Sequence, residues 1–298
     1  MEPFTLVAPD GAALAAYRRL PKGEPKAVVQ IAHGMAEHFE RYDRLARTLN
    51  AAGYAVYGAD HRGHGRSADV HGLGSFGEGG FQAVVDDMAA LSAVAREAAA
   101  GRPLVLLGHS MGSFAAQLYL LQYSSNLAAL VLSGTAAMDK LLEAMLASGG
   151  PAGLEALNAA FEPGRTGFDW LSRDEAEVDA YIADPLCGFA LEESAMQSMF
   201  GLGASARSDA RLARVRHDLP IYIISGERDP VVGPDQAFTR ALIESYRAAG
   251  LRRIEHRIYP GGRHEMFNET CRDQVEAELV AWLDVALDTA QAGFDKSA

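Results

Sequence analysis

Short runs of apolar residues recur along the chain, and segments whose apolar positions have helical spacing separate most of them. The run at residues 27–32 is nearly continuous and rich in β-branched residues, which is typical of a strand covered on both faces. We interpret further runs as strands at residues 4–8, 14–19, 54–59, 104–107, 129–132, 221–224 and 253–259. Helical patterns occupy residues 42–52, 81–99, 112–122, 235–249 and 273–286. This alternation predicts an α/β protein with βαβ units and a mostly parallel sheet.

The alternation stops between residues 135 and 217. Only helical pieces are found there, with breaks that contain Gly and Pro between them; they occupy residues 138–147, 153–161, 173–182 and 191–202. We therefore predict a helical insertion at residues 135–217, between two strands of a single core. That core would be formed by residues 1–134 together with residues 218–298.

The composition is that of an ordinary globular protein, with 49% hydrophobic and 22% charged residues among 298. The formal net charge of −12 argues against permanent binding to nucleic acid or to anionic membrane surfaces, because both attract basic patches. The chain has two cysteines, Cys187 and Cys271, which lie far apart in the sequence and do not form the pattern of a disulfide framework. Residues 1–20 lack the pattern of a signal peptide. These features predict a cytoplasmic location.

The strongest motif in the chain is G-x-S-x-G at residues 108–112, with Ser110 at its centre. It follows an apolar strand and precedes a helical pattern, the context in which such a serine sits on a strained turn. Because the turn is tight, the residues two before and two after the serine must lack side chains, and Gly108 and Gly112 meet this requirement. We expect Ser110 to be a nucleophile at the sheet edge, beside a helix N-terminus.

A serine needs an oriented base, and the chain order expected on such a sheet is Ser, then Asp or Glu, then His. Asp229 follows the strand at 221–224 by a few residues, so its carboxylate can reach the edge where Ser110 is expected. Glu227 and Asp235 are the competing carboxylates. We prefer Asp229 as the orienting acid because of its position.

His264 is the only histidine in the loop after the last predicted strand. The alternative base, His256, lies within that strand, so its side chain would point into a face of the sheet. The spacing from Ser110 to Asp229 leaves room for the insertion, and the spacing from Asp229 to His264 leaves room for one helix and one strand. We therefore expect His264 to be the general base.

The strand at residues 27–32 ends in His-Gly-Met-Ala-Glu-His at residues 33–38. A His-Gly pair at this point is where a hydrolase would place its second oxyanion donor. We assign the two oxyanion-hole donors to the backbone N–H groups of Met35 and Met111.

Four histidines in two neighbouring strand-end loops, His33, His38, His61 and His64, also allow a metal site to be considered. The chain has no H-E-x-x-H motif and no cysteine near these histidines, and a serine nucleophile needs no metal. We expect neither a metal nor a cofactor. The charged, Gly-rich loop at residues 60–67 lacks a P-loop pattern, so we expect it to brace the strand ends.

Four motifs taken together, at residues 33–38, 60–67, 108–112 and 261–265, resemble the monoacylglycerol lipase and lysophospholipase group of α/β-hydrolases. The resemblance covers nearly the whole chain outside the insertion. It implies an eight-stranded sheet flanked by helices, with a helical lid where the insertion is predicted. It also implies that Ser110, Asp229 and His264 form the catalytic triad and that Met35 and Met111 are the oxyanion donors.

Apolar residues of the insertion fall at helical spacing and could roof a substrate pocket, although the same spacing also fits the inner face of a lid packed on the core. The residues that we expect at the pocket are His33, Gly34 and His109 beside the nucleophile, and Met138, Leu142, Met145, Met196 and Met199 in the insertion.

The expected reaction is the hydrolysis of carboxylic esters through an acyl-enzyme, with monoacylglycerols or lysophospholipids as substrates. The alternatives are a broad-specificity carboxylesterase, an acyltransferase, and a catalytically dead homologue that only binds a ligand. We expect a small-molecule or lipid ester as partner, no nucleic acid, and at most transient membrane contact through the cap. The sequence does not specify an oligomeric state.

Overall fold

The computed structural model describes residues 1–147, 154–207 and 209–294. One eight-stranded sheet forms its centre, in the order β1-β2-β4-β3-β5-β6-β7-β8. The strands are β1 (Glu2–Val7), β2 (Ala13–Arg19), β3 (Val28–Ala32), β4 (Ala55–Ala59), β5 (Leu104–His109), β6 (Ala129–Ser133), β7 (Ile221–Gly226) and β8 (Ile254–Tyr259). β2 pairs antiparallel with β1 and β4, and the other pairs are parallel. The predicted eight-stranded, mostly parallel sheet is confirmed.

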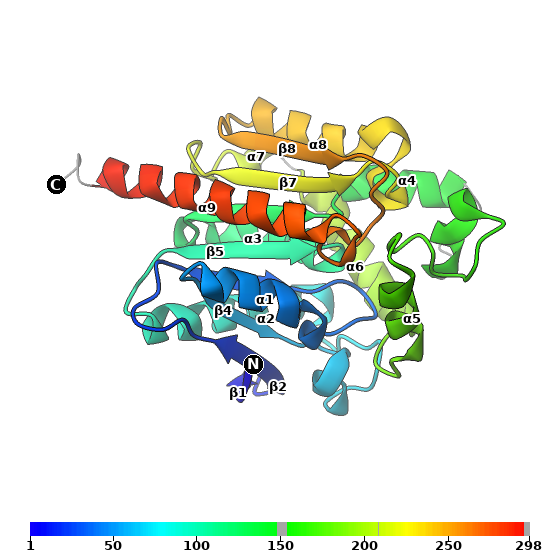
Figure 1. The fold of residues 1–298 in the computed structure, drawn as a ribbon, viewed down its shortest axis with the longest axis horizontal. Helices are drawn as coiled ribbons and strands as arrows, with labels where there is room; N and C mark the ends of the chain where they lie inside the picture. The colour runs from blue at the N-terminus through cyan, green and yellow to red at the C-terminus, as the bar shows by residue number, and fades with distance from the viewer. Residues whose placement is uncertain (148–153, 208, 295–298) are drawn as a thin grey trace.

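Helices cover both faces of this sheet (Figure 1). The helices of the core are α1 (Asp43–Ala51), α2 (Gly80–Ala98), α3 (Met111–Tyr123), α8 (Ala237–Ala248) and α9 (Arg272–Phe294). Short 3-10 turns are η1 (Phe39–Tyr42), η2 (Gly65–Asp69), η3 (Ser124–Asn126), η5 (Pro230–Val232), η6 (Pro234–Gln236) and η7 (Met266–Asn268). The prediction that α8 begins at residue 235 is wrong, because Asp235 and Gln236 have φ angles of 48° and 64°, outside the right-handed helical region.

Alternate residues of each central strand enter two different hydrophobic clusters. In β3, Val29 and Ile31 pack with residues of α1 and α9, whereas Val28 and Ala32 pack with residues of α2, α3 and α8. Both faces of the strand are therefore buried. This arrangement explains why the strand is an almost continuous apolar run rather than an alternating one.

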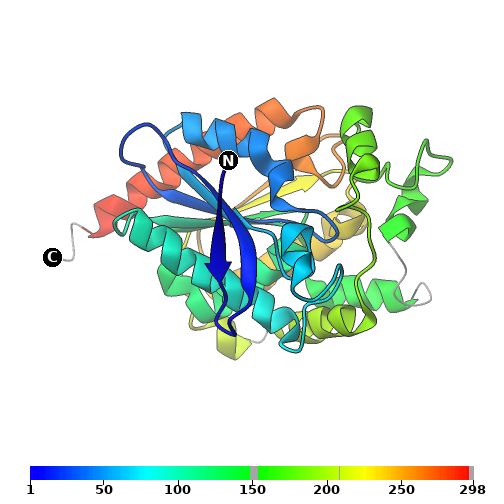
Figure 2. The same cartoon turned by 90° about the horizontal axis from the view of Figure 1, so that it is seen from below.

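The described residues between β6 and β7 form helices and loops and contain no strand. The helical elements are α4 (Met138–Ala147), η4 (Leu154–Phe161), α5 (Glu175–Ala183), α6 (Glu193–Ser205) and α7 (Asp209–Leu212). α4, η4 and α5 gather at the edge where the parallel strands end, whereas α7 lies toward the other end of the strands (Figures 1 and 2). α6 contacts α2, α3 and α4. The ligand-binding edge of an open α/β sheet is thus covered by this segment. None of the described helices is both long and apolar enough to cross a lipid bilayer.

Candidate active site

Ser110 occupies a strained turn between β5 and α3. Its φ and ψ angles are 50° and −120°, and its backbone N–H donates to the carbonyl oxygen of Ser133 at 2.9 Å. A Cβ atom on Gly112 would lie 2.2 Å from the carbonyl oxygen of Ala32, and one on Gly108 would lie 2.5 Å from the carbonyl oxygen of Gly112. Both glycines are therefore needed, because a side chain at either position would collide with a neighbouring backbone segment. The tight turn that they allow presents Ser110 at its tip.

His264 and Asp229 form a buried hydrogen-bonded pair. Nδ1 of His264 lies 3.0 Å from each carboxylate oxygen of Asp229. Oδ1 of Asp229 also accepts from the backbone N–H of Val231 at 2.9 Å, which fixes the carboxylate at the start of η5. An ionised carboxylate can only accept, so Nδ1 of the imidazole carries a proton. In the neutral ring, Nε2 is then free to take a proton from a nucleophile.

Ser110 lines a cavity next to which His264 lies, although His264 is outside the described lining and no hydrogen bond joins the two residues in the described part of the chain. The ring of His109, the residue before Ser110, lies 4.7 Å from the ring of His264. The ring of Trp170 lies 4.8 Å from that of His264, and Trp170 lines the same cavity as Ser110. In ligand-free structures catalytic hydrogen bonds are often long and tighten when the substrate binds.

Opposing effects act on the pKa of His264. Burial lowers it, whereas the charge of Asp229 and the hydrogen bond to it raise it, with smaller contributions from Glu265 and Glu37. The net effect is a pKa above the ordinary 6.5. In contrast, burial and the proximity of His264 lower the pKa of His109 to about 4, so this neighbouring ring stays neutral.

This raised pKa predicts the position of the acidic limb in the pH profile of kcat/KM. A general base works only when it is neutral, so activity should rise with pH and reach half of its plateau above pH 6.5. The profile is measured with a p-nitrophenyl ester across the acidic range. A rate that holds its plateau well below pH 6.5 would contradict the assignment of His264.

The two predicted oxyanion donors lie beside the nucleophile. Met111 is the first residue of α3, so its N–H has no acceptor within the helix. Met35 and Met111 line the same cavity as Ser110, and neither backbone N–H donates to another described residue. A Cβ atom on Gly34 would lie 3.3 Å from Cβ of Ser110, so the loop that carries Met35 closely approaches the nucleophile.

A buried ion-pair network joins this oxyanion loop to the loop that carries His264. Arg41 donates to Glu37 at 2.7 Å and to the two carboxylate oxygens of Glu265 at 2.6 and 2.8 Å. Glu37 in turn accepts from the Tyr42 hydroxyl and from the backbone N–H of Gly34. Burial raises the pKa of Glu265, but the charge and hydrogen bonds of Arg41 lower it to about 2. The sequence motifs contain both glutamates, yet sequence reasoning assigned them no role.

Arg41→Met is expected to lower the free energy of unfolding by about 3–5 kcal/mol, because it leaves two buried carboxylates without their cation. Chemical denaturation measures this change. The matched control is Arg66→Met, which breaks the exposed pair with Glu40 and should change stability by about 1 kcal/mol or less. Equal losses in the two variants would contradict this account of the network.

The cavity at Ser110 has a volume of about 360 Å³ and is mostly apolar. Three of the residues predicted at the pocket, Met145, Met196 and Met199, line it. The other described lining residues are Met35, Ser110, Met111, Phe114, Leu141, Leu154, Ala156, Leu157, Trp170, Phe189, Ala190, Leu191, Phe200 and Val231. Helical spacing singles out Leu141, whereas Trp170 and Phe189 lie in irregular segments that no periodicity marks.

Five residues predicted at the pocket are absent from its described lining: His33, Gly34, His109, Met138 and Leu142. His33 is fully buried, and its Nε2 accepts from the backbone N–H of His61 at 2.9 Å. Gly34 packs closely against the ring of His109 and against Ser110. Met138 packs against Gly203 of α6, and Leu142 packs against the core.

The histidines considered as metal ligands do not form one cluster. His33, His61 and His64 pack together, with the ring of His33 at 4.2 and 5.3 Å from the other two. Burial lowers the pKa of all three rings. Nε2 of His38 instead lies within hydrogen-bonding distance of a carboxylate oxygen of Asp184, at 2.9 Å.

Cys187 brings a third possible metal ligand close to His38 and Asp184, with the three ligand atoms within 4.8 Å of one another. Burial raises the pKa of this thiol, so a metal that bound there would have to displace its proton. We interpret the group as a hydrogen-bonded His–Asp pair beside a thiol.

Comparison with known proteins identifies the family of the chain. Residues 23–271 match the hydrolase family described as serine aminopeptidase, S33. The chain belongs to this family. This S33 hydrolase is 33% identical to a monoacylglycerol lipase of Mycolicibacterium smegmatis, over 88% of this chain and 90% of that protein. It is 29% identical to a monoglyceride lipase of Mus musculus, over 97% of this chain and 92% of that protein.

Solved structures agree with these relatives. The S33 hydrolase superposes on a thermostable carboxyl esterase from Bacillus coagulans with a TM-score of 0.84 and 26% identity, over 96% of this chain and 98% of that one. It superposes on the monoacylglycerol lipase of Paleococcus ferrophilus with a TM-score of 0.68 and 25% identity, over 91% and 99% of the two chains. The resemblance to α/β-hydrolases of the monoacylglycerol lipase group is thereby confirmed.

Proposed function

We propose that this protein hydrolyses carboxylic esters of lipids, with monoacylglycerols as its main substrates. One observation carries the proposal: the strained Ser110 lines an apolar cavity, and Trp170 of the same lining contacts the ring of His264, which is paired with Asp229. The names of its relatives support the same substrate class.

In the proposed mechanism, Ser110 Oγ attacks the ester carbonyl while Nε2 of His264 takes the hydroxyl proton. The N–H groups of Met35 and Met111 donate to the oxyanion that forms, and Asp229 stabilises the imidazolium. His264 then gives its proton to the leaving alcohol, and the acyl group stays on Ser110. Water, deprotonated by His264, attacks the acyl-enzyme and releases the carboxylic acid. None of these steps requires a cofactor.

The cavity favours an acyl chain over a charged group. Its described lining contains no Lys, Arg, Asp or Glu side chain. Recognition of a lysophospholipid headgroup would use a cation for the phosphate, and an aminopeptidase would use a carboxylate for the free amine of its substrate. Each methylene buried in such a lining contributes about 0.8 kcal/mol, so the lining suits a long chain.

The helical segment at residues 135–217 is, in this proposal, the cap of the active site. It supplies Met145, Met196 and Met199 to the cavity, whereas residues 1–134 and 218–298 supply the reacting groups. Contact with a lipid surface would be transient and would occur through this cap. The proposed location of the enzyme is the cytoplasm.

A chain-length series tests the substrate assignment. We expect kcat/KM for monoacylglycerols to rise with chain length, by up to about fourfold per methylene, until the cavity is filled. Lysophosphatidylcholine and an aminoacyl p-nitroanilide should be poor substrates. A flat profile, or a preference for the shortest esters, would instead indicate a broad-specificity carboxylesterase, which the likeness to the Bacillus coagulans enzyme also suggests.

A further inference from the structure

The segment at residues 169–174, which precedes α5, is bound to the loop that carries His264. The backbone N–H of His264 donates to the carbonyl oxygen of Trp170 at 3.2 Å, and that of Glu265 donates to the carbonyl oxygen of Leu171 at 2.8 Å. These two bonds pair the segment with the histidine loop along their backbones. The general base is therefore held from the cap as well as by Asp229.

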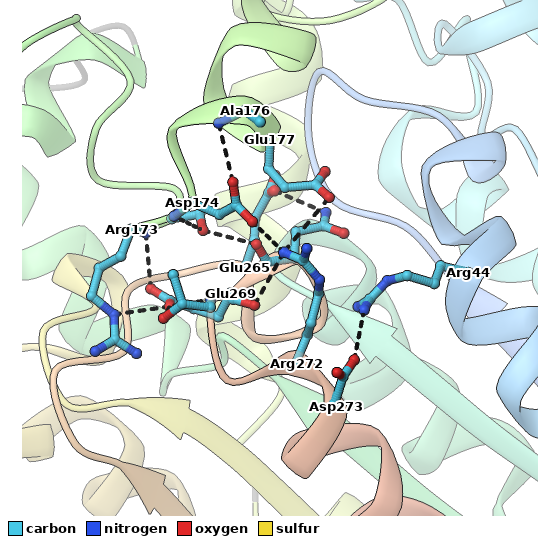
Figure 3. Close-up of polar contacts among 12 residues, drawn as sticks. Arg44, Arg173, Asp174, Ala176, Glu177, Glu265, Glu269, Arg272 and Asp273 are labelled. Atoms are coloured by element: carbon cyan, nitrogen blue, oxygen red, sulfur yellow. Dashed lines mark hydrogen bonds and ion pairs between the residues drawn. The ribbon is translucent and has the colours of Figure 1, made fainter.

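Glu269 joins the same two segments through its side chain (Figure 3). Its carboxylate is fully buried. One oxygen accepts from the backbone N–H of Arg173 at 3.0 Å and from that of Arg263 at 3.1 Å. The other accepts from Nε of Arg173 at 2.9 Å and from the backbone N–H of Thr270 at 2.7 Å. A single carboxylate thus ties the cap to the residue that directly precedes His264.

The ion pair strengthens this connection, to which the Arg263 guanidinium also contributes by donating to the carbonyl oxygens of Asp169 and Ser172. Arg173 supplies the cation of the cap that faces Glu269, and hydrogen bonds to charged groups are roughly twice as strong as neutral ones. Loss of the guanidinium would leave the carboxylate buried with backbone donors and the Thr270 hydroxyl, and the two segments would separate more readily. Because Trp170 contacts the His264 ring, separation would also change the surroundings of that ring.

We propose that Arg173 and Glu269 are positioning residues for the general base. Their ion pair holds residues 169–174 against the loop at residues 263–269 and so keeps His264 in its productive place. The cap then has two roles, since it covers the cavity and also orients a catalytic group. This inference rests on the proposed function.

Kinetics of Glu269→Gln and Arg173→Gln test the proposal. With a short p-nitrophenyl ester, which makes little use of the acyl cavity, we expect kcat to fall about 10- to 100-fold while KM changes by less than about threefold. The rate of covalent labelling by a fluorophosphonate should fall by the same factor as kcat. Arg173→Lys keeps a cation near Glu269 and should recover part of the lost rate.

Arg272→Gln is the matched control. Arg272 also anchors the cap, through Asp174 at the start of α5, but reaches only the backbone carbonyl of Glu269 (Figure 3). Its kcat should stay within about twofold of wild type, since the ion pair between Arg173 and Glu269 remains intact. Thermal unfolding above the assay temperature must be shown for each variant. The side chain of Arg173 is one-third exposed, so its replacement should be tolerated by the fold. The Arg173 variants therefore test the proposal even if Glu269→Gln does not fold.

Two results would overturn the inference while leaving the proposed function intact. One is wild-type kcat in folded Arg173→Gln. The other is an equal loss of kcat in Arg272→Gln, which would indicate general loosening of the cap. A wild-type protein that neither hydrolyses esters nor reacts with the fluorophosphonate would instead overturn the proposed function and this inference together.

Discussion

Replacing Ser110 by alanine is expected to lower kcat for ester hydrolysis by about 10⁴- to 10⁶-fold, because the acyl group then has no atom to which it can be transferred. The residual rate would come from binding and from the oxyanion donors. The fold should remain intact, since the removed hydroxyl forms no hydrogen bond with another described residue. Hydrolysis of p-nitrophenyl butyrate measures the loss, and thermal unfolding measures the fold.

The structure offers a matched control for this variant. Ser225 Oγ lies 3.0 Å from Nε2 of His256, so this serine also has a histidine close to its hydroxyl. Ser225 is buried at the end of β7, and it lies outside the described lining of the cavity. Ser225→Ala should therefore keep wild-type kcat. A large loss of kcat in Ser225→Ala, together with wild-type activity in Ser110→Ala, would show that Ser225 is the nucleophile and would refute the assignment of Ser110.

Replacing Asp229 by asparagine is expected to lower kcat by roughly 10⁴-fold. The carboxylate accepts from Nδ1 of His264, whereas an amide can present a donor to that atom and so favour the other tautomer. Nε2 would then carry the proton and could not act as the base. The loss of the negative charge also removes the largest of the effects that raise the pKa of His264.

Glu227→Gln is the control for Asp229→Asn. Glu227 was the nearest competing carboxylate in the sequence, but the structure places it on the surface, where it accepts from the backbone N–H of Gly261. Its replacement should leave kcat within about twofold of wild type, as expected for a surface change away from the reacting groups. If kcat fell strongly in Glu227→Gln but stayed at the wild-type value in Asp229→Asn, the orienting acid would be Glu227 and not Asp229.

The sheet and the position of Ser110 were predictable because local rules determine them. A strand buried on both faces must be apolar at nearly every position, as β3 is. A serine on a strained turn needs glycine neighbours, and the contacts that a Cβ on Gly108 or Gly112 would make show the reason. The order of Ser110, Asp229 and His264 followed from the order of the parallel strands that carry them.

The lining of the cavity was only partly predictable, because long-range packing determines it. Met138 and Met145 occupy the same helical face in the sequence, yet one packs against α6 and the other lines the cavity. Trp170 follows no periodic pattern and reaches His264 only because residues 169–174 pair with the histidine loop. No spacing rule connects Arg41 with Glu265, which lie 224 positions apart.

Covalent labelling tests most directly whether Ser110 is the nucleophile that His264 activates. The folded protein is treated with a fluorophosphonate, digested, and its peptides are analysed by mass spectrometry. We expect a single adduct, on the peptide that contains Ser110, and none in Ser110→Ala. An adduct on another residue, or a folded protein that does not react, would contradict the assignment.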